Sequence, residues 1–238
     1  MVDKIGVWLR EQVQKAGKKG LILGLSGGVD SACVAALAKM AFPNNSLGLI
    51  MPCEQSSLDA EMAINLADKL DLTIKKIPLD KTYNTLLEIL PPSEDKISKA
   101  NLKPRLRMLT LYYFANIHNY LVVGTSNKSE ITIGYYTKYG DGGVDLLPLG
   151  EFYKTEVKKI AEELGIPREI ILRKPSAGLW AGQFDEDEIG ISYFKLDEII
   201  KAIESGNTGD INKSELDKVM KMIENSRHKN QPISVFPR

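Results

Sequence analysis

The chain contains little cysteine, no excess of charge of either sign and no long apolar run. Only Cys33 and Cys53 occur among the 238 residues. This excludes a disulfide framework or a cysteine zinc site, so we expect both thiols to pack as small hydrophobes in a reducing cytoplasm. Basic and acidic residues number 31 each, a balance that argues against nucleic acid or a membrane surface as a partner. No run approaches the roughly 18 apolar residues that a membrane span needs.

What the sequence does contain is an alternation of predicted strands and helices. The strands are expected at 21–25, 47–51, 72–77 and 120–123, and the helices at about 2–16, 30–41, 57–70, 80–89 and 100–118. Continuous apolar strand runs are typical of a sheet buried on both faces. The alternation predicts an α/β fold, an open parallel sheet flanked by helices, in one domain over 1–238. The irregular stretches 91–99, 133–150 and 173–188 are long, and loops of that length are usually functional or mobile.

The loop between the first strand and the next helix is the most informative segment. This glycine loop comprises Gly24, Leu25, Ser26, Gly27, Gly28, Val29, Asp30 and Ser31. Adjacent glycines let the backbone approach a ligand, and the free N–H groups and dipole of the following helix attract phosphate. Asp30 would repel phosphate unless a cation lay between them, so the loop predicts a pyrophosphate site with Mg²⁺. It matches neither the Walker loop nor the dinucleotide fingerprint.

A second loop, residues 124–130, follows the strand expected at 120–123 and ends in Glu130. Open parallel sheets bind ligands at the carboxyl ends of their strands. If the fourth strand lies beside the first, Glu130 faces Asp30, and two carboxylates with pyrophosphate oxygens suit Mg²⁺. Two other interpretations of Glu130 stay open, a solvated helix residue and a capping acid opposite Asn127.

These residues carry two resemblances. Residues 26–31, Ser-Gly-Gly-Val-Asp-Ser, resemble the PP-loop of ATP pyrophosphatases, whose Rossmann-like fold is of the adenine nucleotide alpha hydrolase type; the alternative is a plain glycine-rich turn. From residue 101 onward, ordered motifs resemble the ammonia-dependent NAD synthetase family. They lie at 101–107, 124–130, 134–145, 154–157, 175–180, 183–186 and 228–232.

The family resemblance implies a reaction and a set of ATP contacts. ATP adenylates the carboxylate of deamido-NAD, pyrophosphate leaves, and ammonia then displaces AMP to give NAD. ATP, the co-substrate, would be held by the glycine loop together with Thr125, Lys154 and Ser176, and Mg²⁺ by Asp30 and Glu130. Lys154 also suits a catalytic role, because its ammonium is a point charge that pairs with phosphate.

The resemblance further implies contacts to deamido-NAD and a proton acceptor. The residues implied to contact deamido-NAD are Arg105, Lys138, Asp145, His228 and Lys229. Asp141 is the candidate acceptor of a proton from bound ammonium, although Asp-Gly-Gly is also a plain turn. Arg105 and Arg107 also fit a basic helix face, Lys138 an exposed loop and His228 a terminal cap. Tyr135, Tyr136 and Tyr139 either pack their loop or line the pyridine site. The chain departs from the family at about 78–99, where Ile97 is a candidate substitute for a substrate-packing aromatic.

Partners and alternatives complete the prediction. We expect free ammonia as the nitrogen source, because no glutaminase segment is recognisable. A homodimer is implied by the resemblance and favoured by apolar residues on two helices, unless both helices simply cover the sheet. They are Val2, Ile5, Trp8, Leu9 and Val13 on one helix, and Leu106, Leu109, Tyr112, Tyr113, Phe114 and Ile117 on the other. The alternatives are another PP-loop enzyme, such as a GMP synthetase ATPase subunit or a tRNA-modifying enzyme, and a non-catalytic adenine-nucleotide-binding module.

Overall fold

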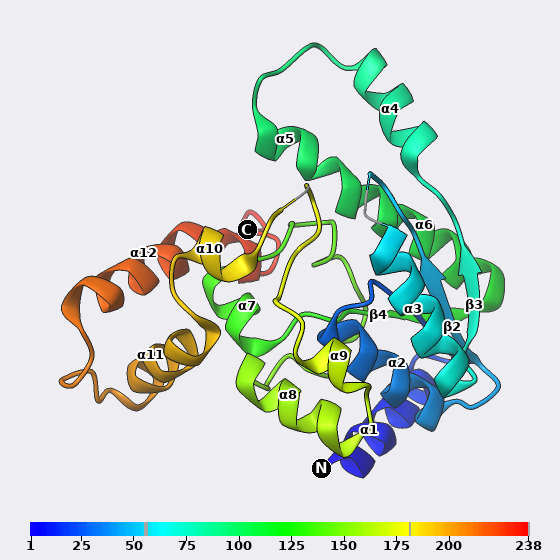
Figure 1. Cartoon of the computed structure of the whole chain (residues 1–238), viewed down its shortest axis with the longest axis horizontal. Helices are drawn as coiled ribbons and strands as arrows, with labels where there is room; N and C mark the ends of the chain where they lie inside the picture. Colours follow the sequence, from blue (N-terminus) through cyan, green and yellow to red (C-terminus); the bar gives the residue numbers. More distant parts are fainter. Residues whose placement is uncertain (55–56, 181, 238) are drawn as a thin grey trace.

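A four-stranded parallel sheet lies at the centre of the larger part of the molecule (Figure 1). The computed structural model describes residues 1–54, 57–180 and 182–237. Its strands are β1 (Gly20–Gly24), β2 (Ser46–Ile50), β3 (Thr73–Lys76) and β4 (Tyr120–Val123), in the order β3-β2-β1-β4. Each lies within one residue of its predicted bounds, and the α/β fold class is confirmed. Because β1 has β2 on one side and β4 on the other, the chain changes direction across the sheet there, which is where such folds bind ligands.

The helices that the structure describes surround this sheet and extend beyond it. They are α1 (Val2–Lys15), α2 (Val29–Ala41), α3 (Ser57–Leu70), α4 (Asp80–Ile89), α5 (Lys96–Ala100), α6 (Leu102–His118), α7 (Lys128–Ile133), α8 (Lys154–Glu163), α9 (Arg168–Ile171), α10 (Asp185–Ile189), α11 (Tyr193–Ser205) and α12 (Lys213–Asn230).

The helix predicted from about 100 to 118 is confirmed as α6, which begins two residues later, whereas the irregular stretch predicted at 91–99 is wrong at its end. The structure has two helices there, because Asp95 begins α5 by accepting hydrogen bonds from the backbone N–H groups of Ile97 and Ser98. The chain then starts α6 after Asn101. Pro104 lies in the first turn of α6, where the missing N–H has no helical partner to lose. The stretch 173–188 likewise contains a helix, α10, at its end.

Side-chain alternation divides the core into two layers on opposite faces of the sheet. Leu21 and Leu23 point into a cluster with α1, α2, α3 and α8, whereas Ile22 points into a cluster with α4 and α6. Successive residues of a strand face opposite sides, so both faces are covered as the apolar runs predicted. Cys33 and Cys53 are buried in the first and second cluster respectively, which confirms their packing role.

The N-terminal helix belongs to this core. Val2, Ile5, Leu9 and Val13 are buried in the first cluster, and only Trp8 of the predicted stripe is exposed. For α1, the interpretation that the stripe covers the body of the fold is therefore the one observed. No helix within the described residues combines the length and apolar character needed to cross a bilayer.

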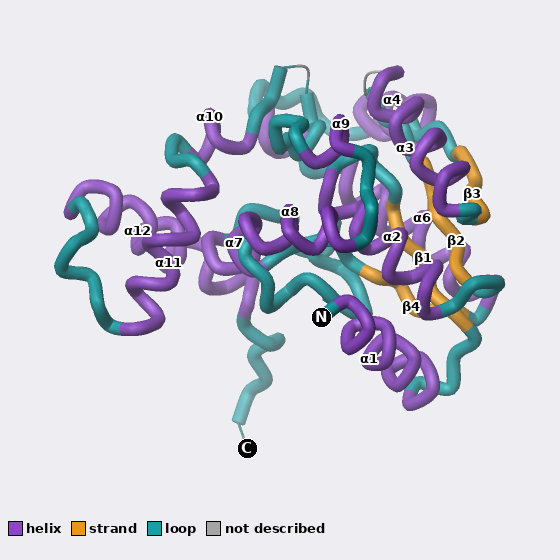
Figure 2. Tube along the Cα trace, turned by 60° about the horizontal axis from the view of Figure 1, so that its bottom comes forward, coloured by secondary structure: helices purple, strands orange, loops and turns teal. Residues whose placement is uncertain are grey.

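A helical lobe stands at the other end of the molecule. Figure 2 shows α11 and α12 at the end opposite the strands. A third apolar cluster, which includes Leu196, Ile199, Ile200 and Val219, holds α11 and α12 to α7. The lobe thus meets the rest of the molecule at α8 and at α7, the helix that begins within the second loop.

Candidate functional site

A cavity of about 420 Å³ opens at the carboxyl ends of β1, β2 and β4. Its wall includes the glycine loop, Met51 after β2, Thr125 after β4 and residues 173–180. Ser176 from that last segment, Asp141 and Lys229 also line it, together with Ile97. The structure therefore brings the predicted ATP contacts together at the predicted edge of the sheet.

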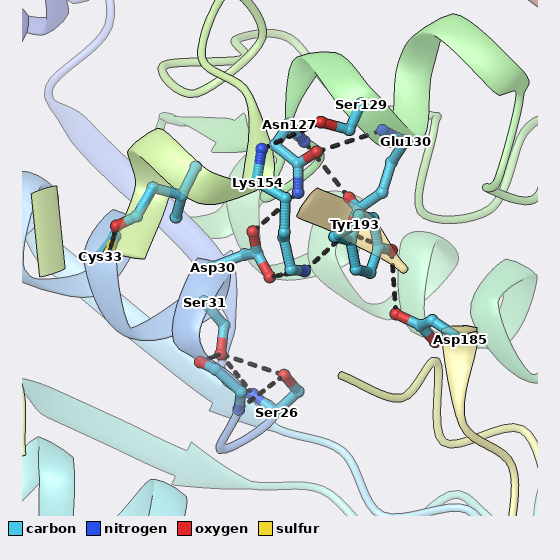
Figure 3. A network of polar contacts seen from close by, with 12 residues as sticks. Ser26, Asp30, Ser31, Cys33, Asn127, Ser129, Glu130, Lys154, Asp185 and Tyr193 are labelled. Carbon is cyan, nitrogen blue, oxygen red and sulfur yellow. Dashed lines mark hydrogen bonds and ion pairs between the residues drawn. The ribbon is translucent and has the colours of Figure 1, made fainter. Parts of the chain in front are cut away.

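The glycine loop is held in a fixed shape by its two serines. The hydroxyls of Ser26 and Ser31 lie 3.0 Å apart, and the Ser31 hydroxyl donates to the Gly28 carbonyl at 2.9 Å (Figure 3). Gly27 has φ +81°, and a Cβ there would lie 2.7 Å from the Asp59 carbonyl oxygen, so only glycine fits. Gly28, which precedes α2, provides no side-chain cap. The first-turn N–H groups of α2 are thus available to an anion.

One ammonium group joins the two predicted metal ligands. Lys154 Nζ lies 2.6 Å from Asp30 Oδ2 and 2.9 Å from Glu130 Oε1, and the lysine is buried (Figure 3). Asp30 and Glu130 thus converge across the crevice as the strand order required. The position between the carboxylates, where the sequence predicted Mg²⁺, contains the lysine ammonium. With both carboxylates ionised, this centre carries one net negative charge.

Glu130 has two functions at once in the structure. Its Oε2 accepts a hydrogen bond from the Asn127 backbone N–H, and the Asn127 side chain accepts one from the Glu130 N–H, which forms a capping box at the start of α7. Oε1 remains directed at Lys154. Asn127 also donates from Nδ2 to Asp30 Oδ1 at 2.9 Å. The capping interpretation is therefore correct, and so is the expectation that Glu130 faces Asp30.

The backbone of Lys154 is fixed from two other helices. Ser129 Oγ accepts a hydrogen bond from the Lys154 N–H at 2.9 Å and donates to Asp197 of α11. Asp197 accepts from the Thr155 N–H at 2.9 Å. These acceptors satisfy free N–H groups of the first turn of α8, and the negative charge of Asp197 is favourable there.

Burial and charge set the protonation of the centre. Burial alone would lower the pKa of Lys154, but Asp30 and Glu130 outweigh it and raise that pKa, so the ammonium stays charged. Burial raises the pKa of Glu130 to about 7, against the lowering effect of Lys154. Proton binding at Glu130 therefore competes with cation binding near neutral pH.

A tyrosine that no sequence pattern indicated packs against this centre. The Tyr193 hydroxyl lies 3.4 Å from Glu130 Oε1 and 3.1 Å from Asp185 Oδ2, and Lys154 Nζ lies 4.8 Å from the centre of its ring. The Tyr135 hydroxyl in turn lies 3.2 Å from Asp185 Oδ1 and 2.9 Å from Glu188 Oε2. In the sequence, Asp185 belonged only to the motif at 183–186, and nothing connected that motif to residue 130.

The three loop tyrosines divide between cavity and surface. Tyr135 and Tyr136 line the cavity, whereas Tyr139 is exposed and has φ +59°. Asp141 lies in the wall beside them and accepts a hydrogen bond from the Thr137 N–H at 2.8 Å. Burial raises the pKa of Asp141, which makes its carboxylate a better proton acceptor.

The predicted deamido-NAD contacts fall into separate places. Lys229 lies in the cavity wall and donates to the carbonyls of Gly134 and Tyr136 at 2.6 and 2.7 Å. Outside the wall, Arg105 donates to the Lys138 carbonyl and Lys138 donates to the His228 carbonyl, so these three form one group.

Asp145 lies apart from that group. Its Oδ2 accepts from the Val122 N–H at 2.8 Å and its Oδ1 accepts from the Tyr112 hydroxyl at 2.9 Å. The aspartate thus anchors the end of β4 to α6, and both of its oxygens are already engaged.

The protein alone offers few metal ligands. Within the described residues, no group of three or more histidine, cysteine, aspartate or glutamate side chains is arranged to hold a metal. Asp30 and Glu130 provide hard oxygen atoms of the kind Mg²⁺ prefers, and any further ligands must come from water or a bound phosphate.

Comparison with known proteins agrees with this geometry. A family model described as NAD synthase matches residues 1–233. An NH₃-dependent NAD⁺ synthetase from Carboxydothermus hydrogenoformans is 48% identical over 231 residues, which cover 95% of this chain and 93% of that protein. An NMN synthetase from Francisella tularensis superposes with a TM-score of 0.91 at 33% identity, over 99% of this chain and 96% of that chain. An NH₃-dependent NAD synthetase from Campylobacter jejuni does so with 0.87 at 30% identity, over 99% and 97%. These similarities span the cavity, both loops and the helical lobe.

Proposed function

The chain belongs to the NAD synthase family, and from this membership we propose how its residues divide the work. It catalyses the ATP-dependent amidation of deamido-NAD with ammonia to give NAD, and is therefore a C–N ligase. The observation that carries the assignment of roles is the Asp30–Lys154–Glu130 cluster beside the glycine loop. We assign ATP to that end of the cavity.

In the first half-reaction, the substrate's own carboxylate is the nucleophile. A carboxylate oxygen attacks the α-phosphorus of ATP, a C–O–P bond forms, and the bond to pyrophosphate breaks. The N–H groups at the start of α2, with the Ser26 and Ser31 hydroxyls, hold the phosphates. Lys154 turns its flexible stem from the carboxylates toward the phosphate chain, where its point charge stabilises the negative charge that develops.

Asp30 and Glu130 would hold Mg²⁺ together with phosphate oxygens of ATP. When bound, the cation screens the repulsion between nucleophile and triphosphate and stabilises the departing pyrophosphate. The donor set fits, because both side chains offer hard oxygens and the nucleotide completes the shell.

In the second half-reaction, ammonia attacks the acyl carbon and AMP leaves. The attacking nitrogen must lose a proton, and we assign its acceptance to Asp141, whose pKa is raised by burial in the cavity wall. Free ammonia is the nitrogen source for the single domain over 1–238 that we propose. Neither thiol suits glutamine hydrolysis, because Cys33 and Cys53 are both buried and burial raises the pKa of each. Two buried, unpaired thiols also support a reducing cytoplasm as the location.

We place deamido-NAD across the cavity mouth, with a homodimer completing its site. Lys229 contacts it from the wall, and Arg105, Lys138, Asp145 and His228 from the surface beyond. On α6, Leu109, Tyr113 and Ile117 are 64%, 64% and 58% exposed, one per turn on one face. Two copies of this face would make an isologous contact. This exposed face lies on the same helix as Tyr112, whose hydroxyl donates a hydrogen bond to Asp145.

One assay tests the function directly. Purified chain is incubated with ATP, Mg²⁺, ammonium and deamido-NAD, and NAD and pyrophosphate are measured; equal amounts of both are expected. A parallel arm replaces deamido-NAD with nicotinate mononucleotide, because one solved relative is named an NMN synthetase. A kcat/KM higher for nicotinate mononucleotide than for deamido-NAD would contradict the assigned substrate. Pyrophosphate release without amidation of the dinucleotide or the mononucleotide would favour another ATP pyrophosphatase.

A further inference from the structure

The cavity wall contains a guanidinium whose hydrogen-bonding capacity is only partly used. Arg107 of α6 lines the cavity and donates from Nε to the Met51 carbonyl at 3.2 Å. Its Nη2 atom is buried and has no hydrogen-bond partner, and Arg107 makes no ion pair with any residue in the described ranges. A buried cation left in this state costs free energy unless a ligand supplies the missing acceptor.

The position of Arg107 places that cation at the reacting end of the cavity. Leu111, one helical turn later, has a side chain 3.9 Å from where a Cβ on Gly24 would lie, at the start of the glycine loop. Met51, to which Arg107 donates, immediately follows β2. Arg107 therefore lies beyond the carboxyl ends of β1 and β2, on the edge of the sheet where the glycine loop begins.

We propose that Arg107 binds an anionic oxygen of a substrate at the reacting centre. The inference rests on the proposed function, since the anions that meet in this cavity are the pyridine carboxylate of deamido-NAD and the phosphates of ATP. A guanidinium presents a planar set of donors that matches either group, and its charge does not titrate in the working range. Burial lowers the pKa of Arg107, and the nearby carboxylates of Asp141 and Asp59 offset only part of that effect, so an anionic ligand would supply stabilisation that the cation lacks.

The substitution Arg107→Met separates a ligand role from a structural role. Methionine fills the space of the arginine stem without a charge, and replacing an unpaired buried charge by an apolar group is neutral or stabilising. We expect a thermal midpoint equal to or above that of the wild type, together with about 10- to 100-fold weaker binding of one substrate. Arg10→Met, at an exposed position of α1, is the matched control and should change neither.

Calorimetric titrations with two ligand pairs identify the anion. Deamido-NAD and NAD differ in the pyridine carboxylate, and ATP and adenosine differ in the phosphates. A loss confined to deamido-NAD assigns Arg107 to the carboxylate, and a loss confined to ATP assigns it to phosphate. The proposal is overturned if the affinities of Arg107→Met for all four ligands lie within twofold of those of the wild type. It is also overturned if the variant is less stable and binds all four ligands more weakly to the same extent, because Arg107 would then have a structural role. Turnover of deamido-NAD by the wild type is measured first. If the wild type does not convert deamido-NAD, the proposed function is contradicted, whereas the comparison of ATP with adenosine still tests the role of Arg107.

Discussion

Removing the ammonium of Lys154 should expose the charge that it neutralises. In Lys154→Met, methionine can fill the space of the lysine stem, but Asp30 and Glu130 lose the cation that lies 2.6 and 2.9 Å away. Their side chains are only 17% and 14% exposed, so water compensates little. Breaking a buried ion pair by removing one partner costs about 3–5 kcal/mol. For a chain of this size that corresponds to a thermal midpoint lower by about 6–20 °C.

Divalent cations should restore much of this loss, and only in the variant. In Lys154→Met the two carboxylates are free to bind Mg²⁺, which at 100 times its Kd would return about 2.7 kcal/mol. In the wild type the ammonium already lies between them, so Mg²⁺ without nucleotide should raise the midpoint much less. Differential scanning calorimetry with and without Mg²⁺ measures both quantities.

A surface pair provides the control for this experiment. Lys195 lies 3.3 Å from Glu198 on α11, and both side chains are more than a third exposed, so Lys195→Met should cost less than about 1 kcal/mol. A stability loss in Lys154→Met no larger than that in Lys195→Met would contradict the neutralising role of the ammonium. A Mg²⁺ shift no larger in the variant than in the wild type would contradict it equally.

Three further outcomes follow from the site and the exposed face of α6. Asp30→Asn and Glu130→Gln should each lower kcat/KM by at least roughly 100-fold with an unchanged circular dichroism spectrum, since each removes a metal ligand; wild-type turnover in either would contradict the metal assignment. For the wild type, the Mg²⁺ concentration at half activity should rise as pH falls through about 7, because the raised pKa of Glu130 lets protons compete; a constant requirement from pH 6 to 8 would argue against it. Leu109→Asp should shift light scattering toward monomer and lower deamido-NAD affinity, whereas Phe194→Asp, equally exposed on α11, should do neither; a fully active wild-type monomer would exclude a shared site.

Local chemistry explains which parts of the site were predictable. The glycine loop and the second loop each directly follow a short apolar strand, so one short stretch of sequence shows both the strand and the residues that could bind a ligand. The convergence of Asp30 and Glu130 needed one further assumption, that β4 lies beside β1, and the strand pairing confirms it.

The contacts that the sequence did not indicate are long-range. Lys154 was predicted to contact ATP, but its place between two carboxylates depends on residues 124 and 24 positions away. Tyr193 reaches Glu130 across 63 positions, through the packing of α11 on α7. A short sequence pattern does not indicate contacts between such distant positions, because these contacts are set by how the helical lobe packs on the sheet domain. The start of α5 was missed for a different reason, since the cap at Asp95 closely follows two prolines.

The ammonium between Asp30 and Glu130 has a consequence for the order in which substrates and ions arrive. Because the site already contains a positive group, a divalent ion does not bind there simply by being abundant. An incoming metal must first displace the Lys154 ammonium, which is covalently part of the protein. A nucleotide that arrives with its cation offers that ammonium a new partner at the same moment, so the exchange of one positive group for another is coupled to binding. We therefore expect the bound metal to be determined by which metal–nucleotide complexes are present in solution, rather than by the protein's own affinity for free metal ions.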